Sequence, residues 1–299
     1  MPNTTCDLHL HTYYSDGRAS PAEVLRHAAS IGLKTVAICD HDSLKALREA
    51  SNMATELGLE LVPAIELTTR WQPCTSGEPG TDQPLEVDLL GYYIDPDNQE
   101  FLSFVQASFG DIRQRVSECC DLLTQAGYPI SIHDIEAENA RYPGPMKIVT
   151  ALEHKAYASG WNEALPLFRE HWLQIHPPRL TIEQAIDAIH SAGGIAVLAH
   201  PVAVRCQDGW LQSEQLAPLV VAGLDGLEIL HPSLDKEARC HFRSLAKQFD
   251  LLETGGSDDH GWPGGFSRMG SELITYNMVK AMYTRSKQRA HQQDHIRSR

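Results

Sequence analysis

The stretch Asp7-Leu8-His9-Leu10-His11 places two histidines one residue apart near the start of the chain. In a β-strand, residues i and i+2 project to the same side. We therefore expect His9 and His11 to present two imidazole nitrogens to one side, where they can hold a divalent metal ion. The stretch predicts a metallohydrolase, although a surface pair or a buried structural pair of histidines would explain it if it stood alone.

Four further clusters of carboxylates and histidines occur along the chain, most of them at the end of an apolar run. In α/β barrels, the residues at the carboxyl ends of the strands face a common mouth, where the chemistry takes place. We expect the clusters to meet at such a mouth. They are Ser15-Asp16-Gly17, Cys39-Asp40-His41-Asp42, Ala64-Ile65-Glu66 and Gly256-Ser257-Asp258-Asp259-His260.

The composition of the chain narrows its class. It has 299 residues, a hydrophobic content of 42% and a formal net charge of −14. This hydrophobic content is enough for a large buried core and excludes a disordered protein. The negative charge argues against stable binding of duplex nucleic acid or of anionic membranes. A negatively charged substrate would therefore need local cations, which bound metal ions would supply.

The seven cysteines form no Cys-X-X-Cys pair, and their number is odd. We interpret them as small buried hydrophobic residues in a reducing compartment rather than as a disulfide framework or a zinc site. The chain does not open with a charged and then apolar leader, and no apolar run approaches the roughly 20 residues that span a bilayer. These features predict a cytoplasmic protein with no membrane partner.

Short apolar runs alternate with amphipathic stretches in the first hundred residues. Ser20 and Pro21 mark the start of one helix, and Gly58 marks the end of another. The order of elements through Glu66 is βαβαβ, which is typical of a parallel sheet or barrel. The predicted strands cover residues 5–9, 35–39, 59–66, 85–94, 195–199, 224–230 and 251–254, and the predicted helices cover 21–32, 43–57 and 181–191.

From about residue 97 to residue 178 the pattern becomes helical, with helices predicted over 100–126, 133–139 and 147–159. We therefore predict an α/β barrel of residues 1–96 and 179–279 that is interrupted by a helical subdomain of residues 97–178. Residues 280–299 are basic and nearly free of large apolar side chains. They are predicted to form a solvated helix or a disordered tail, with a nucleic-acid-binding arm as the alternative.

Together with Ala199-His200-Pro201, the five clusters resemble the motifs of the PHP (polymerase and histidinol phosphatase) family. The resemblance covers residues 5 to 275 and includes bacterial members with a helical insertion, some of which act on nucleoside 3′,5′-bisphosphates, short oligonucleotides or cyclic phosphates. It implies a distorted, TIM-like (β/α)7 barrel with two or three divalent metal ions at its mouth. It also implies two sets of metal ligands: His9, His11, Glu66 and Asp258 for the first ion, and Asp16, His41 and His260 for the second.

The chain departs from the family pattern at the third metal site. The family usually supplies two further histidines, where this chain has Asp88 and Lys147. Asp88 can still bind a metal ion, whereas a lysine that is protonated at pH 7 normally cannot. We therefore expect two metal ions, with Lys147 pairing with Glu66 and Asp88 and contacting substrate phosphate in place of the third. The alternatives are a three-metal site and an ordinary exposed lysine.

Other residues are expected to take part in catalysis or substrate binding. The resemblance implies that His200 faces the phosphate or the leaving oxygen, and either Asp40 or Asp42 is expected to orient His41, because metal-bound histidines usually donate their other N–H. Arg179 and Arg205 are candidate phosphate contacts. His231 and Glu228, at the end of another strand, are expected either to contact substrate, to support a ligand or to be structural.

The expected function is hydrolysis of a small phosphorylated substrate by a metal-bound hydroxide, with Mn, Fe or Zn as the metal. The substrate implied by the resemblance is a nucleotide phosphomonoester, of the 3′,5′-bisphosphate type, or a short oligonucleotide. Two alternatives stay open: an amidohydrolase-like hydrolase that uses similar ligands, and a degenerate PHP module that binds without catalysis. A serine hydrolase is disfavoured because Ser257 does not lie in a Gly-X-Ser-X-Gly elbow.

Overall fold

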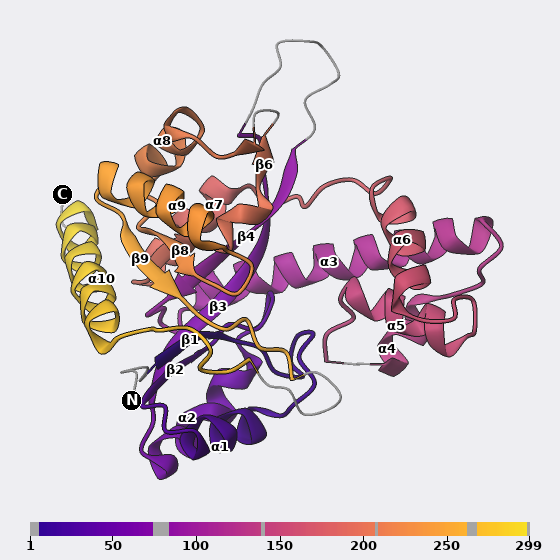
Figure 1. Cartoon of the computed structure of the whole chain (residues 1–299), viewed down its shortest axis with the longest axis horizontal. Helices are drawn as coiled ribbons and strands as arrows, with labels where there is room; N and C mark the ends of the chain where they lie inside the picture. Colours follow the sequence, from indigo (N-terminus) through magenta and orange to yellow (C-terminus); the bar gives the residue numbers. More distant parts are fainter. Residues whose placement is uncertain (1–5, 74–83, 139–140, 207–208, 262–267, 298–299) are drawn as a thin grey trace.

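A computed structural model of the chain describes residues 6–73, 84–138, 141–206, 209–261 and 268–297. Its centre is a sheet of seven strands that curls on itself (Figure 1). The sequence predicts all seven strands to within a few residues, apart from the longer third one. They are β1 (Cys6–Leu10), β2 (Thr35–Ile38), β3 (Glu60–Trp71), β4 (Leu85–Tyr92), β5 (Ile195–Leu198), β8 (Gly226–Leu230) and β9 (Leu252–Gly255).

The strands follow the order β1-β2-β3-β4-β5-β8-β9. The first and last strands meet at one end, where the backbone N–H of Asp258 donates to the carbonyl of His9 at 2.9 Å and His11 donates to Asp259 at 3.0 Å. The curled sheet and the helices around it confirm the prediction of a distorted, TIM-like α/β barrel. Of the ligand clusters, the one with His9 and His11 and the one with Asp258 and His260 lie where the two edges approach each other.

Strand β4 runs antiparallel to both of its neighbours, β3 and β5, while the other neighbouring pairs are parallel. Antiparallel neighbours need no helical crossover between them, and no helix of the described residues lies between β3 and β4 in the chain. The reversal places the first half of β4 at the mouth. Asp88, which pairs with Thr68 of β3, therefore reaches the same edge as residues at the ends of the parallel strands.

Besides the C-terminal helix described below, five helices pack on the outside of the sheet, and several of their ends follow the expected local chemistry. Ser20 and Glu23 form a capping box at the first helix, and Thr181 and Gln184 form one at α7. Gly58 ends the second helix in the left-handed conformation, with φ of 66°. The five helices are α1 (Pro21–Ser30), α2 (Lys45–Leu57), α7 (Ile182–Ser191), α8 (Ser213–Ala222) and α9 (Lys236–Gln248).

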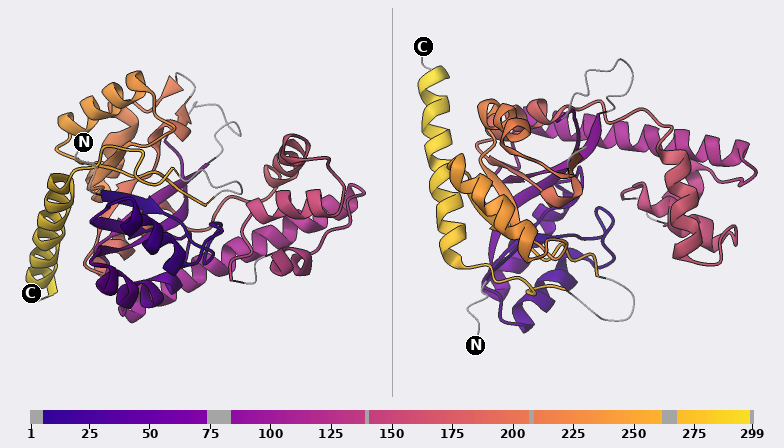
Figure 2. Two further views of the ribbon diagram at one scale, coloured as in Figure 1. Left: turned by 60° about the horizontal axis from the view of Figure 1, so that its bottom comes forward. Right: turned by 45° about the horizontal axis from the view of Figure 1, so that its top comes forward.

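Four helices between β4 and α7 extend to one side of the barrel (Figure 2). Three of them were predicted, and α6 was not; Pro166 lies inside it, where a proline normally disfavours a helix. The early part of α3 packs against the barrel through Phe101 and Val105, and its later part packs in a separate apolar cluster with the other three helices. They are α3 (Gln99–Gln125), α4 (Ile132–Glu138), α5 (Met146–His154) and α6 (Trp161–Trp172).

We refer to α3 to α6 and their connections as the helical insert. Its separate apolar cluster is consistent with a subdomain, but the domain boundaries at residues 96 and 178 stay a prediction. A small hairpin of β6 (Arg205–Cys206) and β7 (Gly209–Trp210) follows the short 3-10 helix η1 (Pro201–Ala203). None of the helices in the described ranges is both long and apolar enough to cross a bilayer.

The described part of residues 280–299 is helical, as one of the two predicted alternatives had it, but it is not a disordered tail and it packs on the barrel. Helix α10 (Tyr276–Arg297) packs along the barrel, away from the helical insert (Figure 1). Val279 and Met282 are buried in the apolar cluster that contains strand residues. The Nε of Arg289 lies 2.9 Å from Oδ1 of Asp225, and its Nη2 donates to the carbonyl of Gly223 at 2.8 Å. These apolar and polar contacts together hold α10 against the barrel.

The cysteine prediction is only partly right. Cys6, Cys39, Cys119 and Cys120 are free and buried, as expected for small hydrophobic residues, and Cys240 is free and exposed. Cys206, at the end of β6, is disulfide-bonded, which corrects the expectation of a chain without disulfides.

Replacement of Arg289 by methionine is expected to destabilise the protein. Asp225 is fully buried, and the substitution would remove the Arg289 partner of its carboxylate while retaining an apolar stem. We expect the free energy of unfolding to fall by about 1 to 3 kcal/mol, measured by urea denaturation. The matched control is Lys287→Met on the exposed side of α10. Equal stability of the two variants would show that the Arg289 contact does not hold α10 in place.

Candidate metal centre

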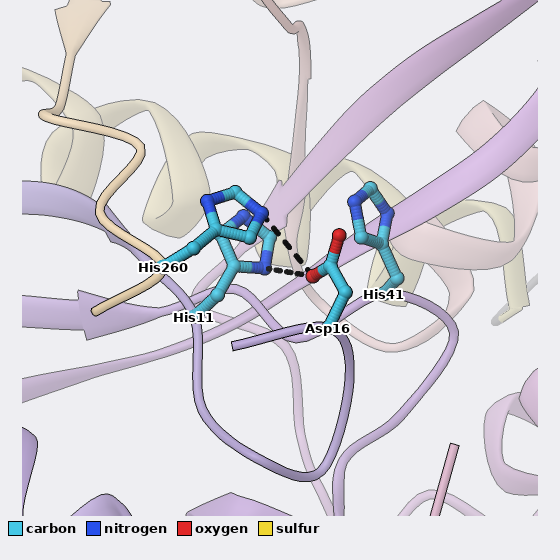
Figure 3. A group of neighbouring side chains, drawn as sticks. All are labelled: His11, Asp16, His41 and His260. Atoms are coloured by element: carbon cyan, nitrogen blue, oxygen red, sulfur yellow. Dashed lines mark ion pairs between the residues drawn. The ribbon is translucent and has the colours of Figure 1, made fainter. Parts of the chain in front are cut away.

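Within the described residues, three groups of side chains bring their nitrogen and oxygen atoms within 4.8 Å of one another. Group A, three members of which surround Asp16 in Figure 3, shares His11 with group B. Group C shares all but Asp88 with the other two. Group A is His11, Asp16, His41 and His260; group B is His9, His11, Glu66 and Asp258; and group C is His41, Glu66 and Asp88.

All eight predicted metal ligands therefore lie in one cluster. The two nitrogens of His11 face different groups: Nε2 lies 3.1 Å from Asp258 and 3.2 Å from Glu66, while Nδ1 lies 3.7 Å from Asp16. The resemblance assigned His11 to the first ion only. The structure places it between both groups. Which ions bind, and which ligands each takes, stays a prediction.

His9 lies in β1 and His11 directly follows its last residue; both are buried, and both belong to group B. The chain after β9 can approach this strand closely because residue 256 is glycine. A Cβ at Gly256 would lie 2.2 Å from the Cβ of His9. Any larger residue would push Asp258 and His260 away from β1.

Asp40 holds the loop after β1 rather than the imidazole of His41. Its Oδ1 accepts hydrogen bonds from the N–H of Thr12 and the hydroxyl of Ser15, each at 2.7 Å, and its Oδ2 accepts one from the Thr12 hydroxyl at 2.6 Å. Asp16 follows directly in this loop. Asp40 thus fixes the backbone that presents a metal ligand, which differs from the role expected from sequence.

Asp42 does not orient His41 either, because Nδ1 of His41 has no hydrogen-bond partner among the described residues. Oδ1 of Asp42 instead accepts a hydrogen bond from the Ser108 hydroxyl of α3 at 2.5 Å. The ring of Tyr142, also in the insert, lies parallel to that of His41, with centroids 6.4 Å apart. The insert therefore supports the loop that carries His41.

Two buried aspartates fix the segment with Asp258 and His260. Asp7 accepts hydrogen bonds from the N–H of Ser257 at 2.9 Å and of Gly270 at 2.8 Å. Asp259 accepts hydrogen bonds from the N–H of Met269 and of Gly261, both at 2.7 Å. These aspartates connect distant parts of the chain. Their roles could therefore not be predicted from the spacing of residues in the sequence.

Glu228, whose role was left open, orients two histidines at once. Its Oε1 lies 2.9 Å from Nδ1 of His9, and its Oε2 accepts the backbone N–H of His200 at 2.8 Å. A carboxylate behind a metal-binding histidine fixes the ring and its tautomer. Glu228 therefore leaves Nε2 of His9 directed at Glu66, 3.0 Å away. The only sequence signal was its place at the end of β8.

The predicted catalytic residue His200 lies beside group C. Its Nε2 is 3.1 Å from Oε1 of Glu66, and its side chain is 20% exposed. His200 has φ of 24°, in the strained left-handed region, just before Pro201. The tightly held backbone aims the ring at the cluster, where it can donate to a bound group.

His231 lies close to the cluster, whereas the two predicted arginine contacts lie elsewhere. Nε2 of His231 is 3.4 Å from Asp258. Arg179 is largely exposed and pairs with Asp111 and Gln114 of α3, and the guanidinium of Arg205 lies 5.7 Å from the ring centroid of Trp210. The structure therefore does not bring these arginines to the metal centre.

A cavity of about 220 Å³ opens beside groups A and B. Lys147 lines it, and its Nζ lies 3.5 Å from the backbone carbonyl of Asp16. Two arginines that the sequence analysis did not single out, Arg18 and Arg268, line it as well. The remaining lining residues are Asp16, Asp258, His260, Met146, Thr150 and Trp161.

Burial and mutual attraction set the charges of the cluster. Burial opposes the charged form of Glu66, but the nearby imidazoles of His9 and His41 outweigh it and hold its pKa well below the usual range. Burial likewise opposes the charged form of His41, yet Glu66 and Asp16 raise its pKa to about 9. Asp16 similarly raises the pKa of His260 to about 10. The carboxylates of the cluster thus favour a positive charge on the imidazoles beside them, and bound metal ions would supply the same charge.

The donor set fits divalent metal ions. Two buried atoms, Nε2 of His11 and Oδ1 of Asp16, have no hydrogen-bond partner among the described residues. Other atoms that could bind a metal ion lie within 4.8 Å of each of them. Buried polar atoms normally have partners, so such atoms call for a ligand. Imidazole with carboxylate suits Mn, Fe or Zn. These residues can therefore hold metal ions, while the number and kind of ion stay a prediction.

The chain is similar in sequence to several bacterial enzymes. A 5′-3′ exoribonuclease of Haemophilus influenzae is 28% identical over 282 residues, covering 91% of this chain and 96% of the relative. A phosphoribosyl 1,2-cyclic phosphate 1,2-diphosphodiesterase of Eggerthella lenta is 28% identical, covering 85% and 94%. A 3′,5′-nucleoside bisphosphate phosphatase of Chromobacterium violaceum is 26% identical, covering 85% and 86%.

The fold has a close match among solved structures. A protein of Bifidobacterium adolescentis, for which metal-dependent phosphoesterase activity has been suggested, superposes with a TM-score of 0.77 and 29% identity, covering 94% of this chain and 96% of its own. The sequence model of the PHP domain matches residues 7–176, which is more than half of the chain and includes six of the eight clustered ligands. The chain therefore belongs to the PHP domain family.

Proposed function

We propose that this protein is a metal-dependent phosphoesterase that hydrolyses a small phosphorylated substrate. The observation that carries the proposal is the meeting of groups A and B, joined by His11, beside a cavity that cationic side chains line. Metal ions held there would neutralise the phosphoryl oxygens and supply a water of lowered pKa. The sequence similarity to nucleotide and phosphodiester hydrolases supports the same conclusion.

The position of each residue in the site suggests a separate role for it. Groups A and B would each hold one ion, and Lys147 would bind a phosphoryl oxygen from the cavity side. His200 would donate a proton to the leaving oxygen. In the absence of metal, burial opposes its charged form, but Glu66 beside it raises its pKa to about 9. Glu228 would fix the ring of His9 and the backbone of His200 relative to each other.

The proposed metal content is two ions rather than three. Of the members of group C, His41 also belongs to group A and Glu66 to group B, and only Asp88 belongs to group C alone. A third ion would therefore compete with the other two ions for His41 and Glu66. Lys147 would take over its role as a cation near the phosphate. The Nζ of Lys147 lies 3.5 Å from the carbonyl of Asp16, whereas the sequence predicted ion pairs with Glu66 and Asp88.

We further propose a nucleotide substrate, either a phosphomonoester of the 3′,5′-bisphosphate type or a short oligonucleotide, and a cytoplasmic location. Two of the three relatives are named for hydrolysis of nucleotides or RNA. A screen of the protein loaded with Mn, Fe or Zn against bisphosphates, cyclic phosphates, short RNA and an amide panel tests this. Amide cleavage without phosphoester cleavage would indicate the amidohydrolase-like alternative, and no turnover at all would indicate a non-catalytic module.

Replacement of His260 by alanine should remove one bound metal ion and most of the activity. His260 belongs to group A alone. We expect kcat to fall about 100-fold or more, because a metal ion contributes several kcal/mol to stabilising the transition state. Metal analysis after gel filtration checks the loss. His133→Ala is the control, since that side chain is 87% exposed on the insert. Unchanged metal content in His260→Ala would contradict the ligand assignment.

Metal binding should release protons. His41, His200 and His260 have pKa values raised from 6.5 to about 9, 9 and 10, so they are protonated at pH 7.5 when a chelator has removed all metal. Metal ions need neutral imidazole, so binding at His41 and His260 expels protons and tightens as the pH rises toward 9. Calorimetry in buffers of different ionisation enthalpy measures this release. A heat of binding independent of the buffer would contradict it.

The same shifts predict how stability depends on pH without metal. A raised folded-state pKa contributes stability that is fully present below the unfolded value of 6.5 and is lost as the pH rises through about 9 to 10. The chelator-treated protein should therefore have a lower melting temperature at pH 10 than at pH 6.5. A melting temperature that rises over this interval would show that the histidines are not paired with the carboxylates.

Replacement of Lys147 by glutamine should impair catalysis without changing metal content. Loss of a charge-assisted contact to phosphate is expected to reduce kcat/KM roughly 10-fold to 100-fold. Lys147→Arg should retain more activity because it keeps the positive charge. Metal analysis at saturation provides the second readout. Three tightly bound ions in the unmodified protein would contradict the proposed role of Lys147.

A further inference from the structure

The cavity beside the metal centre has two walls of different chemistry. Asp16, Asp258 and His260 form the metal side. Met146, Lys147 and Thr150 of α5 and Trp161 of α6 form the opposite wall, which belongs to the helical insert. Arg18 and Arg268 come from two barrel loops. A substrate whose phosphate is held at the metal side must place the rest of its structure between these walls.

The two arginines are fixed relative to the metal centre. The backbone N–H of Arg18 donates to the carbonyl of His260 at 2.9 Å. Met269, which follows Arg268, donates its N–H to Asp259 at 2.7 Å. Both loops are thus tied to the segment that carries Asp258 and His260. Guanidinium groups bind phosphate through two parallel hydrogen bonds, so the cavity offers more cationic partners than a single phosphate at the metal ions requires.

Trp161 gives the cavity an aromatic surface. It is the first residue of α6 and is partly buried against the apolar cluster of the insert, with Met146 of α5 also packed on that cluster. Nucleobases stack on such aromatic side chains without regard to base identity. The volume of about 220 Å³ lies below the roughly 300 to 1,000 Å³ of pockets for drug-sized ligands, which favours one nucleotide unit over several.

We propose that Arg18 and Arg268 bind a second phosphate group of the substrate, the one that is not hydrolysed, while Trp161 stacks on its base. The inference rests on the proposed phosphoesterase function and deepens it by naming the residues that select a nucleotide with two phosphates. It replaces Arg179 and Arg205, which pair with residues away from the cavity.

The phosphate contact is tested with two substrates that differ only in the second phosphate, adenosine 3′,5′-bisphosphate and adenosine 3′-monophosphate. For the variant with Arg18→Gln and Arg268→Gln, kcat/KM for the bisphosphate should fall about 10-fold to 100-fold. The loss for the monophosphate should be at least about 10-fold smaller. The matched control is Arg243→Gln, because Arg243 pairs with Glu253 on the outer surface of α9.

Equal losses on both substrates, or no loss on either, would overturn the assignment of Arg18 and Arg268. If the unmodified protein hydrolyses no phosphoester with any of the three metals, the proposed function itself fails. The two failures are therefore distinguishable. Metal content of each variant confirms that groups A and B are intact.

The base contact is tested at Trp161. Trp161→Leu should raise KM for adenosine 3′-monophosphate or the bisphosphate roughly 10-fold, with a smaller change for ribose 3,5-bisphosphate, which lacks a base. Trp161→Phe should retain most of the affinity because it keeps an aromatic face. If Trp161→Leu affects substrates with and without a base equally, or if phenylalanine does not rescue binding, Trp161 is a packing residue and the stacking role is wrong.

Discussion

The site depends on the burial of one carboxylate, that of Glu66. It is 1% exposed, and a carboxylate removed from water costs several kcal/mol unless it is paired. Its partners come from strands and loops far apart in the chain, which must converge for the charge to be tolerated. The imidazole nitrogens around it are those of His9 at 3.0 Å, His200 at 3.1 Å, His11 at 3.2 Å and His41 at 3.5 Å.

The sequence predicted this convergence because strand periodicity and strand ends are local properties. His9 and His11 share one side of β1 whatever the rest of the chain does. The apolar runs before Asp40, Glu66 and His200 mark strands whose ends must lie at the sheet edge. Asp88 reaches the same edge from the first half of its strand, because β4 is antiparallel to β3. Its direction was not predicted, since a strand does not reveal its orientation within its own residues.

Contacts between residues far apart in the chain could not be predicted from the sequence. Glu228, Asp7 and Asp259 contact residues distant in the chain; Glu228 and His9 are 219 positions apart. Arg179 and Arg205 are common surface residues, and no pattern separates them from Arg18 and Arg268. The packing of helix α10 was not predicted because only a few of its residues are apolar, and its contact from Arg289 to Asp225 joins residues 64 positions apart.

The insert has two roles that are separable in the structure. Its long helix supports the metal centre, since Ser108 holds Asp42 next to His41, whereas its shorter helices form the far wall of the cavity. Changes in α3 should therefore disturb the metal ligands, while changes in α5 and α6 should alter the choice of substrate. The barrel can keep one arrangement of metal ligands while the insert selects the phosphoester, because the two walls of the cavity come from different elements. Chemistry and specificity meet at Lys147, the insert residue whose Nζ lies 3.5 Å from the backbone carbonyl of Asp16.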